Sequence, residues 1–288
     1  MDAFWIILTG SLVAVSCGIL GCYLVLRKMA MIGDAISHSV LPGIVIAFLF
    51  TGSRDSMIML TGAAALGVIT TFLIEFFHRQ GKLQSDAAIG VTFTWLFAIG
   101  IILISWKAGQ VDLDQDCVLY GEIAFISLNT INLGGFEIPQ AVVIMGSVLL
   151  LIILFVSLGY KELFLTTFDP AYASAMGIST ILWHYLLMAM VSLSTVAAFD
   201  NVGAILVVAF MIAPAATAYL LTEKFGQMLG MAIVSGILSS AGGYYLASLL
   251  DGSIAGAMSA VAGLQFLLVL LFAPQNGIIT KKLSGSWK

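Results

Sequence analysis

The chain has 288 residues, of which 61% are hydrophobic and only 9% are charged. A soluble domain carries roughly 25% charged residues because its surface faces water, so this composition excludes a water-soluble globular protein and predicts that membrane lipid surrounds most of the chain. The formal net charge of −4, from 11 basic and 15 acidic residues, provides no basic stripe for nucleic acid, which is therefore not an expected partner.

Nine apolar stretches are long enough to cross a bilayer, since a helical span needs about 20 apolar residues. In chain order they are residues 4–26, 29–50, 56–77, 88–106, 139–160, 180–199, 202–221, 228–250 and 254–273. They are expected to be helices, because an open sheet edge in hydrocarbon would leave backbone groups unpaired. The least regular are 29–50, with its polar N-terminal half, and 202–221, which contains Pro214. The predicted fold class is an all-α integral membrane protein, a polytopic bundle of about eight or nine transmembrane helices forming one domain over residues 1–288.

Lysine and arginine residues in the short connections predict the orientation, because cytoplasmic loops carry the excess of positive charge. With residue 1 outside, nine of the eleven basic residues fall on the inner side, and only Arg54 and Lys107 stay outside. We therefore expect the C-terminus and residues 161–178 to be cytoplasmic and the segment 107–138 to be external.

The most informative polar stretch is Met31–Gly43, which reads MIGDAISHSVLPG. Asp34 and His38 are four residues apart and share one helical face. A carboxylate and an imidazole together suit a divalent cation such as Mn²⁺, Fe²⁺ or Zn²⁺. Two ligands do not complete a coordination shell, but a second copy of this face across a dimer would supply four. The alternative is a charge-assisted hydrogen bond between the two side chains that allows both to be buried, and the spacing alone leaves both interpretations open.

Three further polar positions have simpler interpretations. Glu75 and Arg79, also four residues apart, favour a solvated pair at the inner end of the third span. His184 is expected to be an interfacial or hydrogen-bonded histidine. Asp200 and Asn201, which precede Val-Gly, indicate an outer turn and a helix N-cap.

The predicted external segment 107–138 is acidic. Asp112, Asp114 and Asp116 imitate the start of an EF-hand loop, but Cys117 stands where that loop requires glycine, so no calcium site is expected. A vestibule that attracts cations, a docking rim for a partner and a merely solvated loop are all compatible with this composition.

On the predicted inner side, Asp169 and Pro170 can begin a short helix as its N-cap and first residue. Gly177 can end that helix. The segment 168–178 is then either an ordinary connector or a projecting knob that fits a groove in a cytoplasmic partner.

Four stretches together resemble the permease subunits of ABC-type manganese, zinc and iron importers. They are MIGDAISHSVLPG (31–43), FDPAYASAMG (168–177), VGAILVVAFMIAPAATAY (202–219) and DLDQDCVLYGEIAF (112–125), the last of which is closer to the manganese and iron branch. The likeness covers nearly the whole chain. It implies a permease that forms a dimer, with a second copy or a paralogue, in the fold class shared with vitamin B12 and siderophore importers. It also implies a bacterial cytoplasmic membrane location, an ATP-binding subunit inside and an extracellular or periplasmic metal-binding protein outside.

The resemblance also implies roles for particular residues. The metal-coordinating positions of the family correspond to Asp34 and His38, and its coupling segment corresponds to residues 168–178. The positions expected to couple to the ATP-binding subunit are Phe168, Asp169, Pro170, Ala171 and Gly177.

The chain contains no GxxxxGK[ST] phosphate loop. It is therefore not expected to be an enzyme or to bind a cofactor of its own, and ATP hydrolysis is expected in a separate subunit. The expected cargo is a divalent metal, manganese first, with zinc or iron(II) as alternatives. Two other classes compete: a metal carrier driven by an ion gradient, and an intramembrane metal-dependent hydrolase. The hydrolase is disfavoured because no HExxH spacing occurs among His38, His78 and His184.

Overall fold

The computed structural model describes residues 2–51, 56–107, 123–133, 136–273 and 277–283. Within this part of the chain, nine helices are long and apolar enough to cross a membrane. They are α1 (Asp2–Leu26), α2 (Ile32–Thr51), α3 (Ser56–Arg79), α4 (Ser85–Lys107), α6 (Gln140–Leu158), α9 (Thr180–Val202), α10 (Ala204–Leu221), α11 (Phe225–Leu250) and α12 (Ile254–Phe272). The all-α bundle predicted from the sequence is confirmed, including the two irregular spans.

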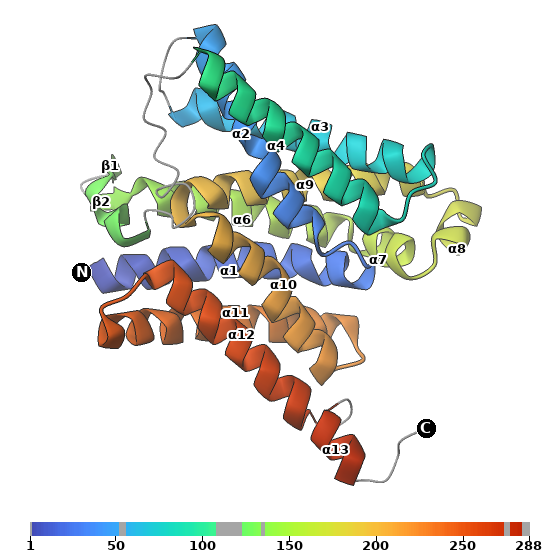
Figure 1. The fold of residues 1–288 in the computed structure, drawn as a ribbon. Coiled ribbons are helices and arrows are strands. Elements are labelled where there is room, and N and C mark those ends of the chain that lie inside the picture. Colours follow the sequence, from blue (N-terminus) through green and yellow to red (C-terminus); the bar gives the residue numbers. More distant parts are fainter. Residues whose placement is uncertain (1, 52–55, 108–122, 134–135, 274–276, 284–288) are drawn as a thin grey trace.

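Short elements occupy the two ends of the bundle. They are η1 (Ile123–Leu128), β1 (Thr130–Leu133), β2 (Phe136–Pro139), α7 (Tyr160–Phe168), α8 (Pro170–Ala175) and α13 (Ile278–Leu283). Strands β1 and β2 form an antiparallel hairpin in which Thr130 faces Pro139 and Leu133 faces Phe136. This hairpin and the N-terminus lie at one end, and α7 and α8 lie at the other (Figure 1). The aspartates at 112, 114 and 116 are outside the described residues.

Successive long helices alternate in direction, so every second connection lies at the same end of the bundle (Figure 1). The connections at the α8 end carry Arg27, Lys28, Lys82, Lys161 and Lys224. The fold therefore gathers these basic residues at one end, as the predicted orientation requires.

Helix α1 lies at the centre and packs against α6, α9, α10 and α11. Its buried residues range from small side chains such as Ala14 and Cys17 to the fully buried Tyr23. Gly21 of α1 meets the backbone of α10 so closely that a β-carbon there would run into the carbonyl oxygen of Met211. Close backbone approach of this kind provides packing between helices that are surrounded by lipid.

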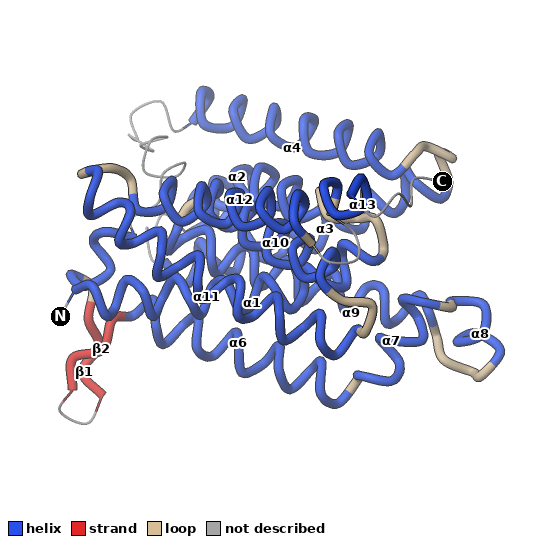
Figure 2. Tube along the Cα trace, turned by 90° about the horizontal axis from the view of Figure 1, so that it is seen from below, coloured by secondary structure: helices blue, strands red, loops and turns tan. Residues whose placement is uncertain are grey.

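Helices α2, α3 and α4 form a layer on one side of this centre. Figure 2 shows α4 at the margin of the bundle, and its main neighbours are α2 and α3. Helices α2 and α3 are in close backbone contact at Gly43 and Gly62, where a β-carbon on either residue would meet the carbonyl oxygen of the other. The half of α2 that follows the predicted metal ligands is thus packed directly against the backbone of α3.

The expected N-cap at Asp200 and Asn201 is wrong. Helix α9 continues through both residues to Val202, and the Asn201 side-chain amide donates a hydrogen bond to the carbonyl oxygen of Ala197 at 2.7 Å. The chain turns at Gly203 instead, with a φ of 79°, and α10 begins at the next residue. Glycine tolerates this positive φ because it has no β-carbon, so a single residue suffices for the turn.

Candidate functional site

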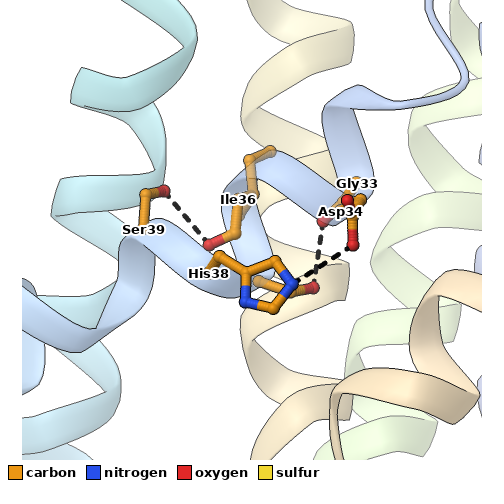
Figure 3. Close-up of polar contacts among 6 residues, drawn as sticks. Gly33, Asp34, Ile36, His38 and Ser39 are labelled. Carbon is orange, nitrogen blue, oxygen red and sulfur yellow. Dashed lines mark hydrogen bonds and ion pairs between the residues drawn. The ribbon is translucent and has the colours of Figure 1, made fainter. Parts of the chain in front are cut away.

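Asp34 and His38 lie in the first turns of α2, with their side chains on the same face (Figure 3). The distance from His38 Nε2 to Asp34 Oδ1 is 3.5 Å, and the two side chains are 28% and 38% exposed for Asp34 and His38 respectively. A charge-assisted hydrogen bond between such groups would be about 2.7–2.9 Å long. The pair is therefore neither buried nor tightly closed on itself, and both groups retain capacity to bind a cation.

Two serines of α2, close to Asp34 and His38 in the chain, form hydrogen bonds to the backbone of the same helix. Ser37 donates a hydrogen bond to the carbonyl oxygen of Gly33 at 2.9 Å, and Ser39 Oγ lies 3.1 Å from the carbonyl oxygen of Ile36 (Figure 3). The Ser39 hydroxyl is also 2.8 Å from that of Thr70 on α3. This bond between helices holds the ligand-bearing turns against α3.

Two aromatic rings of α4 flank the imidazole of His38. The ring centres of Phe93 and Phe97 lie 5.9 Å and 6.1 Å from that of His38. They limit the directions in which the imidazole can turn. Sequence reasoning did not find these two residues, because phenylalanines on a transmembrane helix have the same spacing whether they face lipid or a ligand.

One chain supplies an incomplete set of metal ligands. Among the described residues, no group of three or more histidine, cysteine, aspartate or glutamate side chains could hold a metal ion together. Asp34 and His38 therefore form half of a possible site, and further ligands would have to come from outside this set.

A second polar cluster lies at the α8 end of the bundle, and it corrects one expectation. The Glu75 carboxylate is not solvated but buried, with its Oε2 atom 3.2 Å from Nε2 of His184; the two side chains are 7% and 11% exposed for Glu75 and His184. The side chain of Arg79 is outside the described set. Nε2 is close enough for a hydrogen bond to this carboxylate, but the imidazole ring is not aligned for one.

Arg27 completes this cluster. Its guanidinium group donates hydrogen bonds to the hydroxyls of Thr167 (3.1 Å) and Thr166 (3.0 Å) on α7, and Nη1 lies 3.4 Å from Nδ1 of His184. Arginine can only donate, so Nδ1 accepts, and the proton of a neutral imidazole is on Nε2, the ring nitrogen nearer Glu75. The expectation of a hydrogen-bonded His184 is thereby confirmed. Burial lowers the pKa of Arg27 to about 10, which leaves it charged at neutral pH.

The segment 168–178 has the predicted helical structure. The Asp169 carboxylate accepts a hydrogen bond from the backbone N–H of Tyr172 at 2.9 Å, Pro170 begins α8, and Gly177 has a φ of 82° beyond its end. Phe168 and Ala171 are exposed. The short helix projects beyond the ends of the long helices (Figure 1).

Comparison with known proteins gives a family of transport proteins by sequence and a similar fold by structure. The sequence profile described as the ABC 3 transport family matches residues 3–273. The chain is 52% identical over 280 residues to the manganese transport system membrane protein MntD of Bacillus subtilis (strain 168), covering 97% of this chain and 95% of that protein. It is 42% identical over 276 residues to the zinc transport system membrane protein TroD of Treponema pallidum (strain Nichols), covering 96% and 75%. Its structure resembles a chain of PsaBC from Streptococcus pneumoniae in complex with Fab, with a TM-score of 0.79, 31% identity and coverage of 97% and 94%.

Proposed function

Since this chain belongs to the ABC 3 transport family, we propose that it imports divalent transition metal ions, with manganese as the preferred cargo, in a complex powered by ATP. The role of a multi-pass membrane permease follows from the family and from the nine candidate spans in the described part of the chain. The cargo, the site and the partner subunits are our proposal.

The geometry of Asp34 and His38 carries the proposal. A carboxylate and an imidazole stand on one helical face, half-exposed and 3.5 Å apart. A second permease, either a copy or a paralogue, would bring two such faces together and supply two oxygen and two nitrogen ligands. Residence at this site must be short, because a conducting pathway requires a bound ion to leave again.

The choice of metal rests on the ligand types. Mn²⁺ accepts a mixture of oxygen and nitrogen ligands, whereas soft ions such as Cu⁺ select thiolates. The printed names of MntD and TroD associate those relatives with manganese and zinc. Manganese is our first choice because the more similar of these two relatives is named for it; zinc and iron(II) are the alternatives.

The remaining partners follow from the two ends of the bundle. An ATP-binding subunit would contact α8 and its flanks, which include Phe168, Asp169, Pro170, Ala171 and Gly177. An extracellular or periplasmic metal-binding protein would dock at the opposite end, near β1 and β2. The chain would lie in the bacterial cytoplasmic membrane. It would hydrolyse no ATP itself, since that reaction belongs to the separate ATP-binding subunit. It would hold no resident cofactor, because the metal is its cargo.

Reconstitution tests this function. The chain, its ATP-binding subunit and its binding protein are placed in proteoliposomes, and uptake of Mn²⁺, Zn²⁺ and Fe²⁺ is measured side by side. We expect ATP-dependent uptake in which Mn²⁺ is favoured. Uptake that persists without nucleotide and collapses with an uncoupler would instead identify a carrier driven by an ion gradient.

The coupling role of residues 168–178 gives a separate prediction. Replacing Gly177 by leucine forces a side chain onto a positive φ, at a cost of roughly 1–2 kcal/mol, although a β-carbon there meets no neighbour within 4 Å. We therefore expect the end of α8 to shift and ATP-driven uptake to fall several-fold while the bundle stays folded.

Gly252→Leu is the matched control, because Gly252 has equally open surroundings, has no positive φ and lies between α11 and α12 at the other end. Uptake and co-purification of the ATP-binding subunit are measured for both variants. Equal uptake by the two would contradict a coupling role for this segment.

A further inference from the structure

Arg27 joins two parts of the chain that the proposed function assigns to different tasks. It follows the last residue of α1, in the connection that leads directly to α2 and Asp34. Its hydrogen bonds to Thr166 and Thr167 reach the last turn of α7, immediately before α8. One guanidinium group thus links the segment predicted to meet the ATP-binding subunit with the segment that carries the metal ligands.

A second route leads from the same cluster to α2. His184 on α9 contacts both Arg27 and Glu75, and Glu75 lies near the end of α3. On the same helix, five residues before Glu75, Thr70 forms a hydrogen bond with Ser39, the neighbour of His38. Both routes from Arg27 therefore end at the turns of α2 that hold Asp34 and His38.

The connection between α1 and α2 is stiff enough to transmit a displacement. Lys28 has a φ of 57°. Its N–H bonds to the carbonyl of Val25, and the N–H of Met29 bonds to that of Leu24, which is the Schellman arrangement that closes a helix end. The N–H of Ile32 then bonds to the carbonyl of Met29, so hydrogen bonding continues from α1 into α2.

The cluster contains a charged, hydrogen-bonded group, which a purely structural contact between helices does not require. Apolar packing can join two helices without a buried charge, and replacing buried ion pairs by apolar groups is often neutral or stabilising. Here a charged guanidinium group is held by three side chains from two different helices, α7 and α9. Hydrogen bonds of fixed direction can exist in two discrete arrangements, as a conformational switch requires.

We infer that Arg27 is a positioning residue of the transport cycle, whose hydrogen bonds to Thr166 and Thr167 convey movement of α7 and α8 to the first turns of α2. This inference rests on the proposed function. It adds to that function a defined connection by which the ATP-binding subunit would set the geometry of Asp34 and His38.

The test removes the bonds to α7 and leaves the rest of the cluster in place. In Thr166→Val,Thr167→Val both hydroxyl acceptors are lost, while Arg27, His184 and Glu75 remain. The matched control is Thr9→Val,Thr217→Val, because these are also threonines whose hydroxyls bond to the backbone of their own helix. Both variants are reconstituted with the ATP-binding subunit and binding protein, and Mn²⁺ taken up per ATP hydrolysed is measured together with thermal unfolding.

A hydrogen bond to a charged group changes an equilibrium by roughly tenfold, so we expect uptake per ATP to fall about tenfold in Thr166→Val,Thr167→Val. Hydrolysis and assembly should match those of the control, and the unfolding temperature should stay well above the assay temperature although the guanidinium group loses two acceptors. Unchanged uptake per ATP overturns the inference. So does a fall in uptake that is fully explained by the fraction of protein unfolded at the assay temperature, measured against the control. If this variant fails to assemble, Arg27→Lys decides by the same measurement, since lysine keeps the charge but not the fork of donors. Absence of ATP-driven uptake by the unsubstituted complex would be distinguishable, because it would overturn the proposed function itself and the inference with it.

Discussion

Asp34→Asn is expected to abolish ATP-driven manganese uptake by a permease that still folds and assembles. The substitution keeps the shape of the side chain but removes the negative charge, and it replaces one carboxylate oxygen by an amide nitrogen, which cannot bind a cation. In a symmetric dimer the loss occurs twice. We expect uptake in proteoliposomes to fall by about 100-fold or more, since even partners that only support a metal ligand are worth about 10–100-fold. His38→Ala should have the same effect.

Stability distinguishes this outcome from a structural role. An exposed ion pair contributes only about 0–1 kcal/mol, and Asp34 and His38 are partly exposed, so thermal unfolding should change little. Asp86→Asn and His78→Ala are matched controls, because both residues are exposed and belong to other helices. Full transport by a well-folded Asp34→Ala,His38→Ala variant would exclude the metal site. Loss of expression in step with loss of uptake would favour the structural alternative.

Gly21→Ala is expected to have the largest effect on folding. The new β-carbon would lie far inside contact distance of the Met211 carbonyl oxygen on α10, and backbone atoms cannot move aside as a flexible side chain can. Helices α1 and α10 would have to separate at the centre of the bundle. We expect a destabilisation of about 3 kcal/mol or more, measured by thermal unfolding and by the monodisperse fraction recovered in detergent.

Gly18→Ala provides the control for Gly21→Ala on the same helix. A β-carbon at Gly18 would meet Ala232 of α11 at an ordinary contact distance of 3.7 Å. Alanine also favours the helix by up to about 1 kcal/mol relative to glycine. Gly18→Ala should therefore be neutral or stabilising, and equal unfolding temperatures for the two variants would show that the close approach of α1 and α10 is not required.

The sequence was sufficient for features that depend on local pattern. The spans are apolar runs of the required length, Asp34 and His38 are related by helical spacing, and the cap at Asp169 is read from adjacent residues. The hairpin of β1 and β2 was missed, although Gly134 and Gly135 between TINL and FEIP are a known hairpin signal.

The cluster of Arg27, Glu75, Thr166 and His184 could not be predicted in this way. Its members come from four helices or connections far apart in the chain, and only tertiary packing brings them together. Helical spacing relates Glu75 to Arg79, but it carries no information on burial. Glu75 lies inside the bundle and contacts His184 of another helix, which only the tertiary structure reveals.

The central position of α1 has a consequence for how the protein is made. This helix is synthesised before two of its main neighbours, α10 and α11, which follow it by more than half of the described chain. Until these two helices are made, Gly21 lacks its neighbour on α10 and Gly18 lacks its neighbour on α11. The innermost helix is therefore made before the helices that enclose it, so a chain that ends before α10 would leave this helix uncovered on the side where α10 and α11 pack.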